Sequence, residues 1–438
     1  MSERTNVNIC LIAFSLMFIS TFAIASTTFD SNSLGNRSNY YRIFTTLGAA
    51  SLCIFPILTN ASRVGHGIFS PAFLFLLYGM YACFTGIYLE QNSLYVIWKG
   101  FEIVVASLIV VNLLSCPEPN RFARKPYELS VFIFCILLVV YWIEAAIFPS
   151  EIFAPQTGFK GAFGFTMQGY IPVKNPNSMG FLAAIVSFAM MCAFTRPARI
   201  SKKTIYLSLL ILSLGMLILA QARTSLAGFV LAAGAFLVLE RRYKTLIAGG
   251  FVCGILFFFT QLTENVGAYI TRGQPESHIE ALSGRIYGWQ AALSNFWEAP
   301  LLGHGFVAFS RTEIGSGGNL HGSVFEVLVG VGLLGALPWV SAILWTGISV
   351  LRLPKLRRYG AIDNLRRSYD AEITGVFIIV ASRGVTSSTL AEHGGELMLL
   401  LSVIVYVCAK RYAAKDDMLS RQKESLRAQH MKKQYFVS

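Results

Sequence analysis

The stretch that decides the fold runs from Thr263 to Leu320 and reads TENVGAYITRGQPESHIEALSGRIYGWQAALSNFWEAPLLGHGFVAFSRTEIGSGGNL, with His321 directly after it. It is mostly polar, it separates two strongly apolar segments, and no other loop of the sequence is as long. Loops longer than about 15 residues in a compact protein are usually functional or disordered. The tryptophans and the helical spacing within this loop argue against disorder. The rest of the chain is therefore interpreted as a frame for it.

The composition is that of a membrane protein. Hydrophobic residues make up 54% of the 438 residues and charged residues 13%, whereas a soluble protein is about 25% charged. The net charge of +13 lies mostly in short loops and in the tail after Lys410, as expected for the cytoplasmic flanks of membrane helices. This placement argues against nucleic-acid binding. The eight cysteines fall in or beside apolar runs, so no disulfide framework is expected.

About twelve apolar runs predict transmembrane helices, because only a helix satisfies its own backbone in hydrocarbon and about 20 residues are needed to cross it. They lie at residues 8–26, 43–60, 68–89, 93–114, 129–148, 177–195, 204–221, 224–240, 245–262, 322–350, 371–389 and 394–410. The predicted fold is an all-α integral membrane protein. Residues 1–410 form one polytopic domain, and residues 411–438 form a basic tail.

Lysines and arginines set the orientation. With a cytoplasmic N-terminus, the inside segments hold most of the 36 such residues, as the positive-inside rule requires. Both termini are then cytoplasmic, and the long loop 263–321, between the ninth and tenth helices, faces outward. The outward loop before the sixth helix ends in Lys174-Asn175-Pro176-Asn177, where Asn177 and Ser178 are candidate helix caps.

An interfacial amphipathic helix is predicted inside the long loop. Ser283 could cap it, Arg285 opens it and Pro300 ends it. The apolar residues that recur on one face are Ile286, Trp289, Leu293, Phe296 and Trp297. Such a helix would lie flat on the bilayer, with Arg285 near an N-terminus whose amides favour anions. The alternative is a packed plug on which Arg285 is a solvated surface charge.

Arg223 stands in the short link Gln221-Ala222-Arg223 between the seventh and eighth helices, so its guanidinium must lie at the outer membrane surface. It could simply snorkel to the interface. Snorkelling arginines usually lie on the inner side, however, and the outer side of this chain is otherwise poor in positive charge. We therefore treat Arg223 as a candidate anion-binding residue.

His321 follows a glycine-rich run and starts the tenth helix. A lone histidine is more often structural than catalytic. Here flexible glycines bring it to the same surface as two arginines, and its charge changes nearest to neutral pH, which suits proton transfer. Glu326 lies slightly deeper and could orient it.

Lys99 and Arg383 are charges within predicted helices, close to their outer ends. Ionisable residues inside membranes are functional candidates, or else they pair with a buried acid. Glu144, near the outer end of the fifth helix, is the obvious partner.

Two absences constrain the chemistry. The sequence has no GxxxxGK[ST] loop, so ATP is not expected to drive the reaction. It also has no Asp-x-Asp, so no metal site is expected and cationic side chains must do the electrostatic work. Arginine suits this role, because its planar fork pairs bidentately with phosphate oxygens.

Several motifs resemble the O-antigen ligase and polymerase superfamily of bacterial membrane glycosyltransferases. They are Gln221-Ala222-Arg223-Thr224, Ser283-Gly284-Arg285-x3-Trp289, Pro300-x2-Gly303-x-Gly305, and His321-x4-Glu326 followed by Gly332-x2-Gly335. The similarity covers mainly residues 175–350. One departure is Gly322, where the family often has Asn after the His.

The resemblance implies an inverting, metal-independent glycosyl transfer without a cofactor, at the periplasmic face of the bacterial inner membrane. The donor would be a glycan linked to undecaprenyl diphosphate, whose polyprenyl tail lies in the membrane lipid. The acceptor would be a sugar hydroxyl of the lipid A core or of a growing polysaccharide chain. Glu326 and Trp289 are expected to support the site.

The resemblance also implies residue roles. His321 would accept the proton of the attacking hydroxyl as general base. Arg223 and Arg285 would stabilise the charge that develops on the leaving diphosphate. Lys99 and Arg383 would hold the diphosphate in the ground state.

Several functions share these features. A ligase, a polymerase and a protein O-glycosylating enzyme carry the same motifs, and Lys174-Asn175 resembles exopolysaccharide polymerases only weakly. The rival from another class is a transporter of anions or polysaccharide that uses the arginines as a binding site. Transporters commonly show internal repeats and broken helices at the bilayer midplane, and neither is clear in this sequence.

Overall fold

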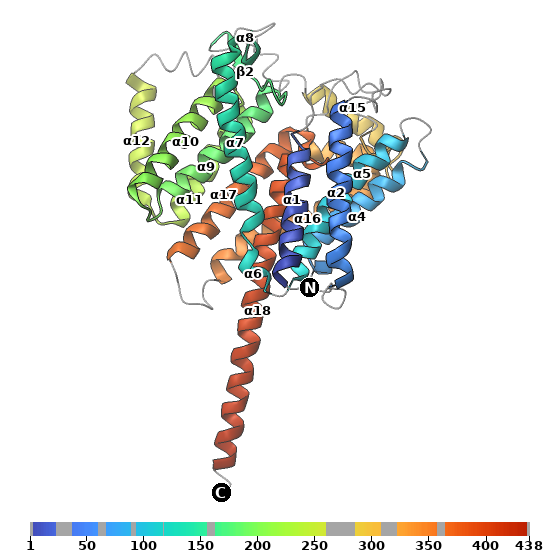
Figure 1. The fold of residues 1–438 in the computed structure, drawn as a ribbon, viewed down its shortest axis with the longest axis vertical. Helices are drawn as coiled ribbons and strands as arrows, with labels where there is room; N and C mark the ends of the chain where they lie inside the picture. The colour runs from blue at the N-terminus through green and yellow to red at the C-terminus, as the bar shows by residue number, and fades with distance from the viewer. Residues whose placement is uncertain are drawn as a thin grey trace.

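The computed structural model shows a bundle of helices (Figure 1). The residues that it describes are 3–22, 37–59, 67–88, 93–116, 118–155, 163–259, 285–307, 322–356 and 364–435. Ser283 and His321 lie outside this part of the chain, and Arg285 is described only in its backbone.

Each of the predicted apolar runs contains a helix. These helices are α1 (Glu3–Ser20), α2 (Arg37–Thr59), α4 (Pro71–Thr85), α5 (Ser93–Ser115), α7 (Lys125–Ile147), α9 (Pro176–Phe194), α10 (Ile200–Leu219), α11 (Arg223–Leu239), α12 (Tyr243–Phe259), α16 (Ser323–Leu356), α17 (Asn364–Thr386) and α18 (Gly395–Tyr435). The shorter helices are α6 (Pro119–Phe122), α8 (Pro149–Ile152), α15 (Arg285–Glu298) and the 3-10 turn η5 (Ser388–Leu390).

Within the described residues, seven helices are long and apolar enough to cross a membrane. Three shorter apolar helices accompany them, over Arg4–Ser20, Pro71–Thr85 and Arg223–Leu239. The prediction of a mainly helical integral membrane protein is confirmed. The number of twelve crossings stays a prediction.

One small sheet departs from the all-α prediction. β1 (Phe153–Pro155) and β2 (Phe165–Met167) pair antiparallel, with Phe153 opposite Met167. Strands of three residues carry almost no alternation that a sequence could show. The pair lies in the loop that precedes α9, beside the start of α11.

Asn175 caps α9, whereas the sequence pointed to Asn177 or Ser178. Its side-chain oxygen accepts a hydrogen bond from the backbone N–H of Ser178 at 2.8 Å. Pro176 then occupies the first helical position, where its missing N–H is not needed. The prediction was wrong by two residues because it placed the proline before the helix.

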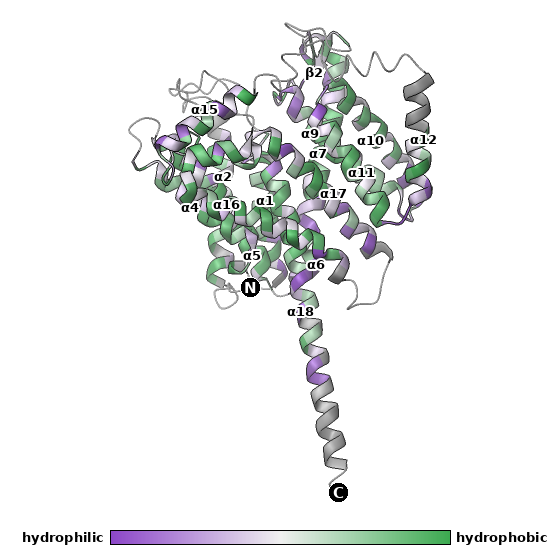
Figure 2. Cartoon of the chain, turned by 180° about the vertical axis from the view of Figure 1, so that it is seen from behind, coloured by the Kyte–Doolittle hydropathy of each residue, from purple (hydrophilic) through white to green (hydrophobic). Residues whose placement is uncertain are grey.

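The centre of the bundle is the first half of α18. Its residues from Leu397 to Ala409 are buried on all sides, and it packs against α5, α7, α16 and α17. The second half runs on through the predicted boundary at residue 410 and projects from the bundle (Figure 1). The N-terminus lies at that same end, while α8 and α15 lie at the opposite end. Figure 2 shows hydrophobic residues along the helices and hydrophilic ones gathered towards both ends.

Ion pairs and hydrogen bonds tie the helices together at the end from which α18 projects. Arg196 pairs with Glu372 of α17, which also accepts a hydrogen bond from Tyr127 at 2.8 Å. Tyr406 of α18 donates to Asp370 at 2.7 Å. The opposite end carries the candidate site.

Candidate functional site

The turn before α11 fixes the place of Arg223. Gln221 adopts a left-handed backbone conformation (φ 49°), and its side-chain amide donates to the carbonyl of Phe165 in β2 at 2.6 Å. Ala222 lies so close to Gly180 of α9 that any side chain at position 180 would overlap it. Arg223 follows as the first residue of α11 and is half-buried. Two tertiary contacts therefore hold the link that presents this guanidinium.

Helices α11 and α17 run antiparallel and pack against each other along their length. At one end the carbonyl of Leu239 accepts hydrogen bonds from Arg367 at 2.7 and 3.1 Å. Further along, a Cβ built on Gly228 would lie 2.6 Å from the Ser382 hydroxyl. The backbone of α11 at Gly228 is therefore in contact with the Ser382 side chain of α17. Arg223 precedes Gly228 by five residues, so it lies beyond Ser382, beside the end of α17 at Thr386.

Helix α15 begins at Arg285, as predicted, and docks on the start of α16. The rings of Trp289 and Phe325 stack at 5.1 Å between centroids and 17° between planes. Ala292 and Phe296 are buried against Val329. Trp297 is 73% exposed and Leu293 is 43% exposed. Leu293 and Trp297 therefore lie outside the face of α15 that packs against α16. That all five apolar residues face the bilayer stays a prediction.

Gly322 explains how Trp289 comes so close to α16. A Cβ built on Gly322 would lie 3.2 Å from the indole nitrogen of Trp289, 3.1 Å from the Phe325 ring and 3.5 Å from the carbonyl of Val385. A larger residue would require the Trp289 and Phe325 rings to shift. Gly322 thus fits closely between this ring stack and the end of α17, at the residue that follows His321.

Ser323 ties the start of α16 to the segment after α17. Its hydroxyl donates to the carbonyl of Ser387 at 2.6 Å and accepts from the backbone N–H of Leu390 at 3.2 Å. The carbonyl of Leu390 accepts from Trp339 at 3.0 Å, and that of Ala391 accepts from Tyr78 at 2.8 Å. The segment from Ser387 to Ala391 is consequently held from several helices.

Glu326 lies in the first turn of α16 and is 2% exposed. Its backbone N–H donates to the carbonyl of Gly322 at 3.1 Å. Its carboxylate is thus buried one turn below the position that follows His321, in agreement with the deeper place expected for it.

Helix α16 is broken at Gly332, and the turn after α15 supplies the missing backbone partners. Gly332 has φ 58° and ψ −166° inside the helix. The backbone N–H groups of Leu333 and Leu334 donate to Pro300 and Leu301 at 2.9 and 3.2 Å. In the other direction, Gly305 donates to Gly330 at 2.8 Å. Non-helical backbone at membrane depth is tolerated only where protein groups satisfy it, which gives the glycines of the Pro300–Gly305 and Gly332–Gly335 motifs a physical role.

Lys99 belongs to a buried cluster centred on Glu102. Its ammonium lies 3.6 Å from the Glu102 carboxylate, which also forms a two-pronged ion pair with Arg42. Nδ1 of His393 lies 3.9 Å from the same carboxylate. All four residues are at most 5% exposed. The Glu102 carboxylate is therefore the shared partner of the Arg42 and Lys99 cations and of the His393 imidazole.

Arg383 pairs with Glu396, in the first turn of α18, at 3.7 Å. The partner that the sequence suggested for Lys99 and Arg383 was Glu144, and this was wrong. Glu144 accepts a hydrogen bond from the backbone N–H of Ile171 at 3.1 Å instead. Both predicted intramembrane cations thus find a carboxylate, from α5 and α18.

Replacing Glu102 by Gln is expected to lower the free energy of unfolding by about 3 kcal/mol, because removing one partner leaves buried charges uncompensated. Thermal and denaturant unfolding in detergent measure the loss. The matched control is Glu128→Gln. The Glu128 carboxylate pairs with Arg124 and Lys125 at the surface of α7, so its loss should lower the free energy of unfolding by less than about 1 kcal/mol. Equal effects of the two variants would contradict the importance of the Glu102 cluster.

Lys174 lies in the loop before α9 and donates to the carbonyl of Thr21 at 2.8 Å. It shares a cavity of ≈ 40 Å³ with Glu396. Burial lowers the pKa of the Lys174 ammonium from 10.5 to about 8, although the Glu396 carboxylate opposes this and Arg42 adds to it. Lys174 thus titrates close to physiological pH.

A pH dependence follows from the lowered pKa of Lys174. Between about pH 8 and 10.5 the unfolded chain binds more protons than the folded one, so this group makes stability rise with pH in that window. We expect the Tm of the native protein, relative to that of Lys174→Met, to increase from pH 7.5 to 10. Melting curves of the native protein and Lys174→Met, recorded at the same pH values, check this. A Tm difference between the two proteins that stays constant with pH would contradict it.

One segment of the chain is similar to a known protein family. Residues 208–340 match the family model described as O-Antigen ligase. This segment belongs to the O-antigen ligase family. No curated protein matches the chain.

The O-antigen ligase domain runs from within α10 to within α16. The predicted site residues inside it are Arg223, Arg285, Trp289, His321 and Glu326. Lys99 and Arg383 come from helices outside it, α5 and α17. The chain is thus a multi-pass membrane protein in which a segment of the O-antigen ligase family packs against further helices, among them α17 and α18.

Sequence reasoning missed the carboxylates that pair with Lys99 and Arg383, and it also missed Arg42. Glu102 had a local signal, since it follows Lys99 by three residues and therefore shares its helix face. Glu396 had none, because its partner Arg383 lies in a different helix. Arg42 had none, because Glu102 lies 60 residues away in the sequence. Among the described residues, no group of three or more His, Cys, Asp or Glu side chains could hold a metal ion. Metal independence stays a prediction.

Proposed function

We propose that this protein transfers a glycan from an undecaprenyl-diphosphate-linked donor to a sugar hydroxyl at the periplasmic face of the inner membrane. The observation that carries the proposal is the O-antigen ligase match, since Arg223, Arg285 and His321 all fall inside residues 208–340. The orientation is supported by the N-terminus and the projecting half of α18 lying at one end of the bundle and α15 at the other (Figure 1).

The arginines serve the leaving group. In the reaction, the bond between the anomeric carbon and the diphosphate oxygen breaks, and the diphosphate departs with the electron pair. Arg223 is held at the outer end of α11 by the Gln221 turn, and Arg285 is the first residue of α15. Helix N-termini and arginines both favour phosphate oxygens. Preorganised cations of this kind stabilise the charge that develops in the transition state.

His321 serves the acceptor. The attacking hydroxyl gives its proton to the imidazole while its oxygen forms the new bond to the anomeric carbon, on the side opposite to the departing diphosphate, so the configuration inverts. The contacts of Gly322 with Trp289 and Phe325 support this assignment, because they fix the residue next to His321 beside the start of α15. Buried Glu326 would support the imidazole.

Lys99 and Arg383 are proposed to assist ground-state binding of the diphosphate. Each is 4% exposed and already paired, with Glu102 and Glu396 respectively. A diphosphate would therefore have to take over from a carboxylate as the partner. Their contribution is smaller than that of Arg223 and Arg285, which come from the O-antigen ligase domain itself.

Product length separates ligase from polymerase. The purified protein is given an undecaprenyl-diphosphate-linked repeat unit in liposomes, with and without the lipid A core acceptor. A ladder of growing chains without core lipid identifies a polymerase, a single transfer that needs core lipid identifies a ligase, and transfer to an added polypeptide identifies protein glycosylation. If no new glycosidic bond forms in any sample while the donor is intact, the enzyme proposal is wrong. The results would then favour a transporter of anions or polysaccharide.

Arg285→Lys distinguishes an enzyme from an anion-binding transporter. Lysine keeps the charge and the general attraction of an anion, but it cannot make the bidentate phosphate contact. We expect glycosyl transfer to fall roughly 100-fold, while retention of the lipid-linked donor changes only a few-fold. Arg311→Lys, in the same loop, is the matched control and should behave like the native protein. An unchanged transfer rate in Arg285→Lys would contradict the proposed role.

A further inference from the structure

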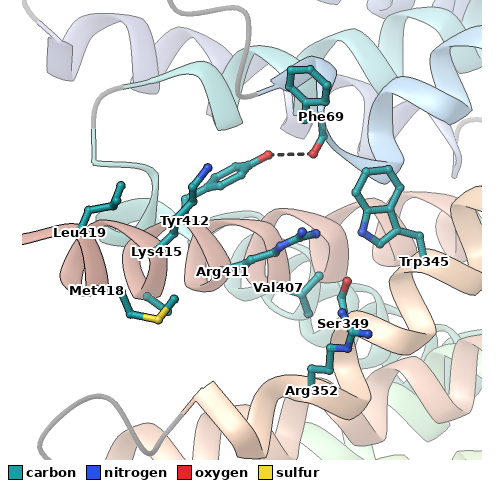
Figure 3. A pocket seen from close by; sticks show the side chains of 11 residues that line it. Phe69, Trp345, Ser349, Arg352, Val407, Arg411, Tyr412, Lys415, Met418 and Leu419 are labelled. Atoms are coloured by element: carbon teal, nitrogen blue, oxygen red, sulfur yellow. Dashed lines mark hydrogen bonds between the residues drawn. The ribbon is translucent and has the colours of Figure 1, made fainter. Parts of the chain in front are cut away.

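A second cavity lies at the opposite end of the bundle from the candidate site, between α16 and α18 (Figure 3). Its volume of ≈ 820 Å³ is in the range of about 300–1,000 Å³ that is typical of ligand pockets. The residues that line it are Phe69, Trp345, Ser349, Arg352, Val407, Arg411, Tyr412, Ala414, Lys415, Met418 and Leu419. None of the proposed catalytic residues is among them.

The cavity has an apolar wall and a basic rim. Trp345 and Val407 form part of its wall, and Phe69, at its mouth, is 73% exposed. The hydroxyl of Tyr412 fastens the Phe69 backbone to α18 at 3.1 Å. An exposed aromatic ring beside an apolar hollow points to a ligand with a hydrophobic part.

The cations of the rim are Arg352 of α16 and Arg411 and Lys415 of α18. Figure 3 shows Arg352 and Arg411 extending into the space beside Ser349. The guanidinium of Arg411 lies 5.9 Å from the centroid of the Trp345 ring. No lining residue among those described is acidic. The rim therefore presents three cationic side chains to the cavity.

The length of α18 sets the depth of this rim in the membrane. The helix has 41 residues, which at 1.5 Å per residue is about 60 Å, or roughly twice the hydrocarbon thickness of a bilayer. It starts at the outer end, where Glu396 meets Arg383. Roughly 20 residues cross about 30 Å of hydrocarbon, which ends the crossing close to Lys415. Val407 then lies at acyl-chain depth, and Arg411 and Lys415 lie at the level of lipid phosphates.

We propose that this cavity binds one anionic diacyl phospholipid. The headgroup phosphate lies among Arg352, Arg411 and Lys415, and the acyl chains run over Trp345 and Phe69. Basic pockets between membrane helices at a cytoplasmic surface recognise anionic headgroups in this way. The bound lipid joins α16, which carries the Gly332 kink, to the central helix α18.

Native mass spectrometry in detergent tests the proposal, with phosphatidylglycerol and phosphatidylcholine of the same acyl chains. We expect phosphatidylglycerol to bind roughly tenfold more tightly than phosphatidylcholine, and the variant R352Q/R411Q/K415Q to lose this preference. The matched control R199Q/K202Q/K244Q removes as many exposed cations at the same end of the bundle and should keep it. Equal binding of the two lipids to the native protein, a preference that survives in the cavity variant, or an equal loss in the control would each overturn the proposal.

A second measurement needs no variant and therefore holds even if the triple substitution does not fold. Phosphatidylglycerol is expected to raise the Tm of the delipidated native protein by several degrees more than phosphatidylcholine does, since a ligand that binds only the folded state stabilises it. Inorganic phosphate is expected to leave the Tm unchanged. If phosphatidylglycerol gives no larger shift, or if phosphate alone reproduces it, the phospholipid site is wrong.

Discussion

Gly332→Ala is expected to abolish recovery of folded protein. Gly332 has φ 58° and ψ −166°, a region of backbone space that is essentially restricted to glycine and costs other residues about 1–3 kcal/mol. A Cβ at this position would also overlap the carbonyl of Leu301 and lie 2.6 Å from the backbone nitrogen of Gly303.

The clash at Gly332 cannot be relieved locally. The backbone N–H groups of Leu333 and Leu334 are bonded to Pro300 and Leu301, so moving the turn away breaks the hydrogen bonds that satisfy the broken helix. Each buried backbone group left unpaired costs about 1–3 kcal/mol. The total, on the order of 5 kcal/mol, is comparable with the whole stability of many proteins.

Gly234→Ala is the matched control for Gly332→Ala. Gly234 lies within α11, and a Cβ built on it meets no described atom within 4 Å, so alanine there should stabilise the helix by up to about 1 kcal/mol. Gel filtration of detergent extracts and melting curves compare the two variants. Recovery and Tm of Gly332→Ala within the range of Gly234→Ala would mean that the kink in α16 does not exist.

The helices themselves could be predicted because hydrophobic length is a local property. Each apolar run carries its own signal, and the start of α15 at Arg285 followed from capping and spacing within one segment. The O-antigen ligase match to residues 208–340 confirms the resemblance seen in short motifs. These features need no knowledge of what packs against them.

The kink and the ion pair between Arg42 and Glu102 could not be predicted, because they depend on residues far apart in the sequence. Hydropathy treats 322–350 as one continuous helix, and only the turn at Pro300–Gly305 makes a break at Gly332 possible. Likewise, Arg42 and Glu102 meet through the packing of α2 on α5. The residues of α15 that pack against α16 could not be predicted for a similar reason, because the contact depends on a helix that follows the long loop.

His321→Gln is expected to lower the rate of glycosyl transfer by about 10²–10⁴-fold while leaving donor binding within a few-fold. General-base catalysis typically contributes an acceleration of that size. Glutamine retains hydrogen-bonding capacity but cannot take up a proton at neutral pH, so it tests proton transfer more sharply than His321→Ala. Single-turnover transfer to the acceptor, with donor binding measured separately, keeps the two effects apart.

The pH profile adds a readout that a merely orienting histidine would not produce. A base must be neutral to accept a proton, so the rate of the native protein should fall as pH drops through the ordinary histidine range near about 6.5, and the residual rate of His321→Gln should not follow this step. His278→Ala, in the same loop, is the control and should keep both the rate and the profile. If His321→Gln keeps its rate within tenfold, or if its residual rate shows the same acid step, the proton goes elsewhere and His321 only orients the acceptor beside Arg223 and Arg285.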